Sequence, residues 1–497
     1  QKMSEGKALI RYFCVPYDTV NGVPQFHTPA DSPEKWNVFR AYNQRDVETE
    51  QAIERRLSRF PVPEFVWQEY ALDQTVNDRG IQVDLQLVQQ AIRMDALTKD
   101  KLLQRMKALT HLDNPNSVYQ LLGWLETQGY PSDSLGKTQV QELIKTAREP
   151  VRSVLELRLQ LSKASVKKYQ AMQNAVCSDG RARGMFQFYG ANRTGREAGR
   201  IIQLQNLPQN HLPDLEAARE LVKSGNLEAV ELLYEDVPDT LSQLIRTAFV
   251  PKPGYQFLVA DFSAIEARVI AWLAGETWRM QAFAEGKDIY CASASKIFGV
   301  PVVKHGINGH LRQKGKVAEL ACGYGGSVGA MKAMGGSGMS DAELKQIVTD
   351  WRTASPHIVQ LWWDVENAAI KAVRDKTETE THGIHFSYES GFLFIRLLSG
   401  RRLAYVKPRI EPNRFGGDSI TYEGIGTNRK WERLETYSGK LVENIVQATA
   451  RDLLFYSMQT LSQYFIVGHI HDEMIIECPK DTKLDEICQQ MARTPDW

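Results

Sequence analysis

The sequence has few cysteines and no long apolar run. Its 497 residues include six cysteines, and none of them forms a Cys-x-x-Cys pair. This excludes a disulfide scaffold and a structural zinc ribbon, and it fits a reducing compartment. No apolar run approaches the ~18 residues that a membrane span needs, and no signal peptide opens the chain. We therefore expect a cytoplasmic protein with no membrane partner.

The chain also lacks a net charge. Lys and Arg number 60, as do Asp and Glu, so any binding to nucleic acid must depend on local charge. The hydrophobic and charged fractions, 43% and 24%, exclude a disordered or fibrous chain, and the length predicts about two to four domains. The opening Gln1-Lys2-Met3 is not typical of a native start, and we interpret the chain as a fragment, with the carboxyl end trimmed as well.

Charge is segregated along the sequence. Residues 137–168 hold eight Lys or Arg against three acids, and apolar residues recur at helical spacing over 151–161. This pattern predicts a basic amphipathic helix over 137–168. A solvated helix face is the alternative, but the aromatic residues and glycines that follow in 186–196 favour a surface for a polyanion.

Two segments place carboxylates at the ends of apolar strands. Residues 257–260 predict a buried strand that ends at Asp261, with a helix over 265–273. Residues 465–478 predict a hairpin with Asp472 and Glu473 at its tip. Both carboxylate positions are also typical of turn formation or helix capping. Two aspartates on adjacent strands would, however, offer the hard oxygen ligands that Mg²⁺ prefers, and the neighbouring His469-x-His471 lacks the pattern of a zinc site.

A third segment predicts a helix over 310–322 that Gly323 ends. Its face carries Arg312, Lys316, Leu320 and Tyr324 at intervals of four residues. The two cations would clamp a polyphosphate, and the tyrosine would offer a flat surface for a base; an ordinary amphipathic face is the alternative. A capping box at Ser340 predicts a further helix, and this mixture of strands and long helices indicates an α+β architecture.

Taken in order, these segments resemble DNA polymerase family A, the group of bacterial DNA polymerase I and many phage enzymes. Asp261-Phe262-Ser263-Ala264-Ile265-Glu266 resembles its motif A, Arg312 to Tyr324-Gly325 its motif B, and His471-Asp472-Glu473 its motif C. Further similarities lie at 194–196, 204–208, 444–452 and 77–84. The resemblance covers roughly residues 40 to the end and is of the phage type.

The resemblance implies a right-hand fold of palm, fingers and thumb. The expected divisions are a carboxyl-terminal remnant of a 3′–5′ exonuclease domain (1–57), the thumb with lead-in helices (58–190), palm with motif A (191–275), fingers with motif B (276–395) and palm with motif C (396–497). Tyr42 and Asp46 resemble the last exonuclease motif. The other exonuclease carboxylates are absent from the chain, so proofreading would belong to a full-length form.

The resemblance also implies primer extension with dNTPs by two-metal-ion catalysis, in DNA replication and with release of pyrophosphate. Two Mg²⁺ ions would be held by Asp261, Asp472 and the backbone carbonyl of Phe262. The implied catalytic residues are Asp261, Asp472, Lys316 and Glu473. The implied dNTP contacts are Arg312, Lys316, Leu320, Tyr324, Glu266 and Tyr290. The implied contacts with primer–template DNA are Arg196, Gln205, Asn206, Gln447, His471, Lys163 and Lys167.

Some positions qualify this interpretation. Leu320 stands where bacterial members usually carry Phe or Tyr, and Tyr290 replaces a frequent histidine. Glu266 favours deoxyribose over ribose, because a glutamate here blocks the 2′-hydroxyl in this family. The alternatives are a catalytically inactive DNA-binding replication protein and a single-subunit RNA polymerase. We expect a monomer that works with replication accessory proteins, in the bacterial host cytoplasm if the source is viral.

Overall fold

The computed structural model describes residues 5–21, 23–413 and 416–497. The chain divides into two compact units, Gln1–Tyr70 and Ala71–Trp497. The first unit contains α1 (Gly6–Cys14), β1 (Asp18–Val20), β2 (Val23–Gln25) and α2 (Pro33–Leu57), and α3 (Glu64–Arg79) crosses the division. Tyr42 and Asp46 lie one turn apart on α2, and a hydrogen bond to Asp46 raises the pKa of Tyr42.

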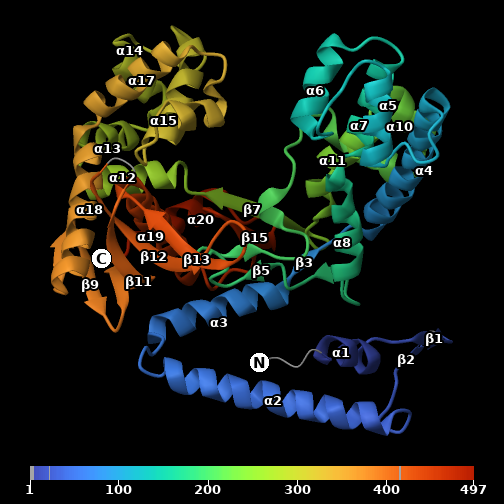
Figure 1. The fold of residues 1–497 in the computed structure, drawn as a ribbon, viewed down its shortest axis with the longest axis horizontal. Helices are drawn as coiled ribbons and strands as arrows, with labels where there is room; N and C mark the ends of the chain where they lie inside the picture. Colours follow the sequence, from blue (N-terminus) through green and yellow to red (C-terminus); the bar gives the residue numbers. More distant parts are fainter. Residues whose placement is uncertain (1–4, 22, 414–415) are drawn as a thin grey trace. The chain divides into compact units, whose positions relative to one another are not determined.

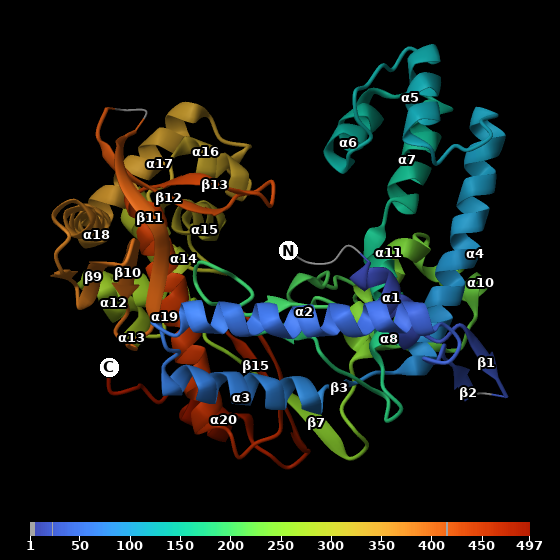
Figure 2. The same ribbon diagram turned by 60° about the horizontal axis from the view of Figure 1, so that its bottom comes forward.

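The second unit places a group of helices on each side of a small sheet. Figure 1 and Figure 2 show α4–α7 together on one side of strands β7 and β15, and α13–α18 on the other. The first group comprises α4 (Leu85–Thr110), α5 (Val118–Thr127), α6 (Lys137–Thr146) and α7 (Val151–Leu161). It is followed by α8 (Lys167–Ala175), α9 (Leu215–Lys223), α10 (Leu227–Tyr234) and α11 (Val237–Gln243).

The prediction of a single basic helix over residues 137–168 is wrong. The segment forms two helices, α6 and α7, then a 3₁₀ turn (Ala164–Val166) before α8 begins. Pro150 caps α7 and cannot sit inside a continuous helix, because it lacks an amide proton and restricts the residue before it. The apolar spacing over 151–161 correctly marks α7, whose Val151, Val154 and Leu155 are buried.

The small sheet has three antiparallel strands in the order β14-β15-β7. β7 (Tyr255–Asp261) ends at the aspartate that the sequence predicts, and α12 (Ile265–Ala274) follows it. β14 (Ile466–Ile470) and β15 (Glu473–Pro479) form the predicted hairpin around a two-residue turn. α19 (Ser438–Thr460) precedes this hairpin, and α20 (Leu484–Met491) follows it.

The segment between β7 and α19 folds into helices and a six-stranded antiparallel sheet. Its helices are α13 (Thr277–Ala284), α14 (Ile289–Phe298), α15 (Arg312–Cys322), α16 (Val328–Met331), α17 (Asp341–Ala354) and α18 (Pro356–Asp375). Its strands are β8 (Thr379–Thr381), β9 (Ile384–Glu389), β10 (Phe392–Arg396), β11 (Arg402–Pro412), β12 (Asp418–Ile425) and β13 (Trp431–Thr436). Ser340 caps α17 by accepting a hydrogen bond from the Glu343 amide, 3.2 Å away, as the capping pattern predicts.

Among the described residues, clusters of buried apolar side chains hold the second unit together, and three of them are large. One joins the three-stranded sheet to α4, α8, α9 and α11. Another joins α12, α15, α17, α18 and α19 to the six-stranded sheet. A smaller one lies among α4–α7. The three-stranded sheet therefore rests on a core separate from that of the helix bearing the Arg312–Tyr324 face.

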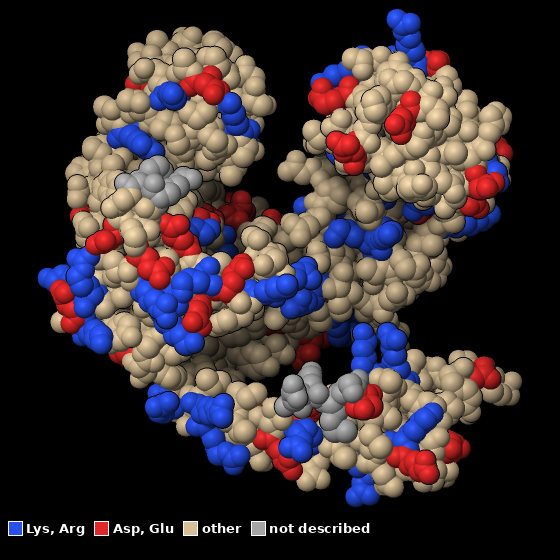
Figure 3. Space-filling view, viewed as in Figure 1, with Lys and Arg blue, Asp and Glu red and all other residues tan. Residues whose placement is uncertain are grey.

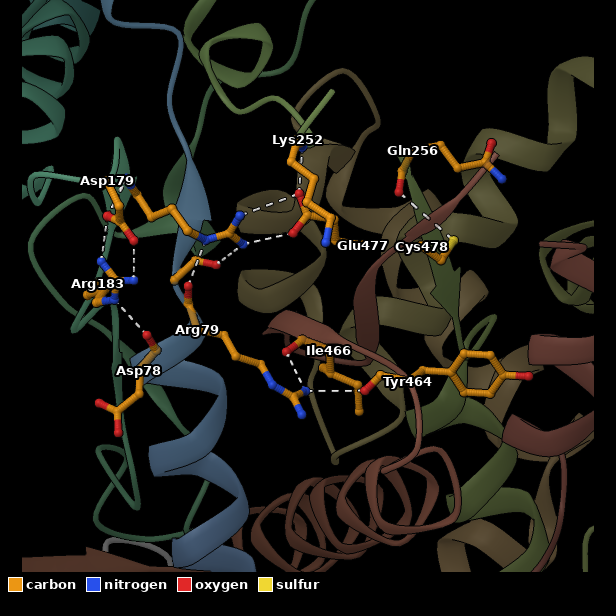
Figure 4. A network of polar contacts seen from close by, with 12 residues as sticks. Asp78, Arg79, Asp179, Arg183, Lys252, Gln256, Tyr464, Ile466, Glu477 and Cys478 are labelled. Atoms are coloured by element: carbon orange, nitrogen blue, oxygen red, sulfur yellow. Dashed lines mark hydrogen bonds and ion pairs between the residues drawn. The ribbon is translucent and has the colours of Figure 1, made fainter. Parts of the chain in front are cut away.

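A polar network ties the three-stranded sheet to the strands β3 (Ile81–Gln82) and β4 (Arg181–Ala182). The fully buried Glu477 of β15 accepts hydrogen bonds from the Arg181 guanidinium at 2.9 Å and from the Lys252 amide at 2.7 Å. Arg79 donates to the carbonyls of Tyr464 and Ile466 at 3.2 and 3.0 Å, as Figure 4 shows. These bonds connect segments that lie almost 400 positions apart in the sequence.

The surface carries charges of both signs. Figure 3 shows Lys and Arg interspersed with Asp and Glu on the face that it displays, in keeping with 60 residues of each sign. None of the helices in the described part of the chain has both the length and the apolar character that a bilayer crossing requires.

Candidate active site

Strand pairing brings the two predicted aspartates to the same end of the three-stranded sheet. β7 and β15 are antiparallel, and Asp261 lies directly opposite Glu473. The amide of Phe262 donates to the carbonyl of Asp472 at 3.1 Å. Asp472 occupies the hairpin turn beside His471, whose φ of 56° lies in the left-handed region that tight hairpin turns use. Two carboxylates 211 positions apart are thus neighbours because of the register.

The electrostatics of these carboxylates reflect their proximity. Burial and the nearby charge of Asp261 raise the pKa of Asp472 to about 6. Burial also raises the pKa of Glu473. Two facing carboxylates resist simultaneous ionisation, and a divalent cation with oxygen ligands would relieve the repulsion. The two aspartate carboxylates therefore offer the hard oxygen donors that magnesium prefers.

Glu266 connects three of the predicted motifs. It lies in the first turn of α12 and accepts a hydrogen bond from the Arg196 guanidinium at 2.7 Å. Its other oxygen accepts from the Tyr324 hydroxyl, also at 2.7 Å. Burial and the Glu266 charge raise the pKa of Tyr324 well above its usual value, so this hydroxyl remains a donor. Glu266 is thereby fixed at the end of α15.

The cationic end of α15 is engaged by α14 in this conformation. Arg312 binds the carboxylate of Asp288 at 2.7 and 2.9 Å, and Asp288 also caps α14 through the Cys291 amide. The Tyr290 ring lies 5.2 Å from the Arg312 guanidinium and 6.0 Å from the Lys316 ammonium group. Tyr290 therefore lies close to Arg312 and Lys316, the two cations that we expect to bind a polyphosphate.

A cavity of about 510 Å³ lies among several of these groups. Its walls include Glu266, Tyr290, Leu320, Tyr324 and Asp472. Residues that sequence reasoning did not assign also line it: Arg279, Glu319, Trp351, Tyr437 and Glu443. One cavity thus reaches from Asp472 at the end of the sheet to Leu320 and Tyr324 of the α15 face, whereas Asp261, Arg312 and Lys316 are not among its walls.

The predicted primer–template contacts fall into two groups. Near the cavity, Arg196 Nε and Gln205 Oε1 are buried with no hydrogen-bond partner among the described residues, and Gln447 lines the cavity wall. Orphaned buried polar atoms are costly, and a nucleic-acid strand would satisfy them. Asn206 is exposed beside Gln205.

The second group, Lys163 and Lys167, lies around the 3₁₀ turn before α8. Lys163 is paired with Asp239, whereas Lys167 is exposed. Neither lysine lines the cavity.

A buried hydrogen-bond network joins residues 194–196 to residues 444–452, two of the segments that carry further similarity to the family. Arg401, which is 3% exposed, donates to Asp452 at 2.6 Å, to the Thr194 carbonyl at 2.7 Å and to the Ala448 carbonyl at 2.9 Å. Arg401 therefore holds the loop that carries Arg196 against the helix that carries Gln447. The sequence patterns mark both segments, but they give no indication that Arg401 joins them.

No cluster of three or more His, Cys, Asp or Glu side chains with metal-binding geometry occurs among residues 5–21, 23–413 and 416–497. His469, one half of the histidine pair at the hairpin, is buried; it contacts Asp73 at 3.2 Å and stacks on Phe186. His469 thus has a packing environment rather than a zinc site. Any cation at the sheet would rely on Asp261, Asp472 and backbone oxygen.

Comparisons with known proteins identify the family. The sequence model "DNA polymerase family A" matches residues 98–393. The chain is 51% identical over 507 aligned positions to the DNA polymerase of Bacillus phage SP02, covering 100% of this chain and 78% of that protein. It is 26% identical to thermostable DNA polymerase I of Thermus thermophilus, over 52% of this chain and 27% of that protein.

A solved structure shows the same fold. The POL domain of Pol1 from M. smegmatis, in a complex with DNA primer-template and dNTP, aligns with a TM-score of 0.57 and 18% identity, covering 99% of this chain and 76% of that one. The family match spans more than half of the chain, and the similarity to the phage relative extends over the whole of this chain. This chain therefore belongs to DNA polymerase family A.

Proposed function

We propose that this family A DNA polymerase extends a primer 3′-hydroxyl with dNTPs at the end of the sheet where Asp261 and Asp472 meet. The carrying observation is the strand register, which places Asp261 opposite Glu473 and joins Phe262 to Asp472 by a backbone hydrogen bond. The adjoining cavity, with α15 as one wall, supports a nucleotide site. Glu473 lies in the same acidic group.

The carboxylates of Asp261 and Asp472, with the Phe262 carbonyl, would hold two Mg²⁺ ions. When bound, these ions supply Lewis-acid activation of the phosphate and stabilise charge on the departing pyrophosphate. The raised pKa of Asp472 supports a cation requirement, because the pair is electrostatically unfavourable without one.

The remaining residues bind and orient the substrates. Arg312 exchanges Asp288 for the β- and γ-phosphates, and Lys316 neutralises the same charge and donates a proton to the leaving group. Tyr324 packs at the templating position, and Tyr290 lies beside the phosphates. Leu320, which is 45% exposed, contacts the nucleotide.

Sugar choice depends on Glu266. Its two hydrogen bonds, to Arg196 and Tyr324, hold the carboxylate in place, so a ribose 2′-hydroxyl would meet a fixed group. This favours DNA synthesis over the RNA polymerase alternative.

The DNA strands are contacted by residues on both sides of the site. Arg196, Gln205, Asn206, Gln447 and His471 bind near the primer terminus, and Lys163 and Lys167 bind duplex phosphates. Contacts of this kind position the duplex and carry little sequence information. The proposal keeps the thumb, fingers and palm divisions that the resemblance implies, with residues 1–57 as a carboxyl-terminal remnant of a 3′–5′ exonuclease domain. Replication accessory proteins are the further partners proposed.

The test is extension of a labelled primer–template with dNTPs and Mg²⁺ by wild type and by Asp472→Ala. We expect a loss of at least about 10³-fold in rate, as for removal of an essential catalytic group. Asp481→Ala, an exposed residue beyond the other end of β15, is the matched control and should extend normally. Equal extension by wild type and Asp472→Ala would reject the catalytic assignment.

A further inference from the structure

A buried ion pair joins α15 to α13 at the wall of the cavity. Arg279 of α13 and Glu319 of α15 have side chains that are 1% and 6% exposed, and two parallel hydrogen bonds of 2.6 and 2.8 Å join them. The bidentate arrangement fixes both distance and direction between the two helices. Glu319 is in the same helix as Lys316 and directly precedes Leu320.

Both members of this pair are satisfied by further bonds. The Trp351 indole of α17 donates to Glu319 at 2.8 Å, and Arg279 donates to the Ser355 hydroxyl at 2.9 and 3.2 Å. Burial opposes ionisation of Glu319, but Arg279 outweighs it and lowers the pKa of the carboxyl. The ion pair therefore binds α15 to α13 and to the α17 region at one point.

One turn before Glu319, and so on the same side of the helix, α15 contacts α14 through its backbone. A Cβ at Gly315 would lie 2.3 Å from the Tyr290 carbonyl, so α15 approaches α14 too closely for any side chain there. Two contacts on the same side of α15 thus fix the helix: a close backbone contact with α14 at Gly315 and, one turn further on, the directional ion pair to α13 at Glu319. These contacts leave the orientation of its nucleotide face little freedom.

A buried ion pair contributes little net stability compared with apolar side chains of similar volume, because desolvation opposes the attraction. What it provides is a defined geometry. We propose that Arg279 and Glu319 are positioning residues that align Arg312, Lys316 and Tyr324 with the incoming nucleotide. This inference rests on the proposed function, since it takes α15 to be the nucleotide-binding helix.

A second ion pair offers a matched control. Lys314 of α15 and Glu343 of α17 lie 2.5 Å apart, with side chains 34% and 39% exposed. This pair joins α15 to the same neighbouring helix, but at the surface, where such pairs contribute little. Lys314→Met should therefore leave nucleotide use unchanged.

The experiment measures single-nucleotide insertion by Glu319→Gln, Arg279→Lys and the double variant Glu319→Gln/Arg279→Met. For each variant, KM for dNTP, kcat, the Kd for primer–template and the melting temperature are determined. We expect KM to rise about tenfold, the factor that corresponds to about 1.4 kcal/mol, with the Kd for DNA unchanged. A merely structural role would lower the folded fraction, and so the apparent kcat, without changing KM.

The double variant separates alignment from stability. Removal of both charges should recover much of the melting temperature that Glu319→Gln loses, while KM stays high because the directional bonds are absent. If Glu319→Gln does not fold, Arg279→Lys and the double variant decide the question. A KM within twofold of wild type in the folded variants, or an equal rise in Lys314→Met, would overturn the proposal. Failure of the proposed function gives a different result: Lys316→Ala would then leave nucleotide use intact.

Discussion

Replacement of Glu477 by glutamine should destabilise the second unit more than most single substitutions. The Glu477 side chain is 0% exposed and Arg181 is 11% exposed, so their interaction is shielded from water and salt. Glu477→Gln keeps the shape and can still accept from the Lys252 amide, but it removes the counter-charge of Arg181. The guanidinium is then left partly buried and without an ion-pair partner.

The magnitude follows from that loss. Removal of one partner of a buried ion pair typically costs 3–5 kcal/mol. Because Arg181 keeps hydrogen bonds to the carbonyls of Arg79 and Gly80, each at 2.7 Å, we expect the lower end, about 3 kcal/mol. The same turn contains a control: Asp179 pairs with Arg183 at 2.6 Å, but their side chains are 48% and 32% exposed. Figure 4 labels Asp179, Arg183 and Glu477.

The assay is equilibrium urea unfolding of wild type, Glu477→Gln and Asp179→Asn, followed by circular dichroism and tryptophan fluorescence. Glu477→Gln should shift the unfolding midpoint strongly to lower urea concentration. Asp179→Asn should have the same midpoint as wild type, because surface ion pairs contribute little to stability. A loss of less than about 1 kcal/mol in Glu477→Gln, the typical effect of a single neutral hydrogen bond, would refute the reasoning.

Two further predictions concern selectivity and pH. Glu266→Ala should raise the use of rNTPs relative to dNTPs by about tenfold or more, measured as the ratio of kcat/KM values. Glu285→Ala, at an exposed carboxylate outside the cavity, is the control; unchanged sugar selectivity in Glu266→Ala would count against this role. Asp84 caps α4 through the Leu87 amide and pairs with Lys223 and Arg219; burial raises its pKa, but these partners outweigh burial and lower it. The stabilisation that Asp84 provides should therefore be present above its unfolded-state pKa of 3.8 and lost as the pH falls. At pH 7, Asp84→Asn should be about 1 kcal/mol less stable than wild type. If the unfolding midpoints of wild type and Asp84→Asn differ as much at pH 3 as at pH 7, this linkage is contradicted.

Local pattern was sufficient for the elements that carry the site. The apolar run before Asp261 predicts β7, the paired runs around Asp472 predict the β14–β15 hairpin, and Ser340 predicts the start of α17; all three elements are confirmed. The predicted burial of residues 257–260 is wrong, because β7 is an edge strand of its sheet and is mostly half-buried, with Val259 46% exposed. The helix predicted over 137–168 is wrong because the apolar spacing of α7 was extended across Pro150. Spacing identifies a helix, but a single breaker sets its limits.

Local sequence pattern does not predict the contacts between secondary-structure elements. Partners such as Arg279 and Glu319, or Arg401 and Asp452, are 40 and 51 positions apart, and nothing local distinguishes them from solvated charges. The six-stranded sheet was missed as a unit for the same reason, although buried Leu403 and Tyr405 alternate with exposed residues in β11. The resemblance to family A predicted which carboxylates converge, but not the network behind them.

The pairing of β7 with β15 has a consequence for biosynthesis. Within the part of the chain that the structure describes, β7 pairs with no strand other than β15, whose first residue follows the last of β7 by more than 200 positions. As the chain leaves the ribosome, β7 must therefore wait with open edges until the late hairpin is made, and long-range strand closure of this kind is slow. Nascent chains stalled before residue 473 should thus be more prone to aggregation and to chaperone capture than chains released beyond it.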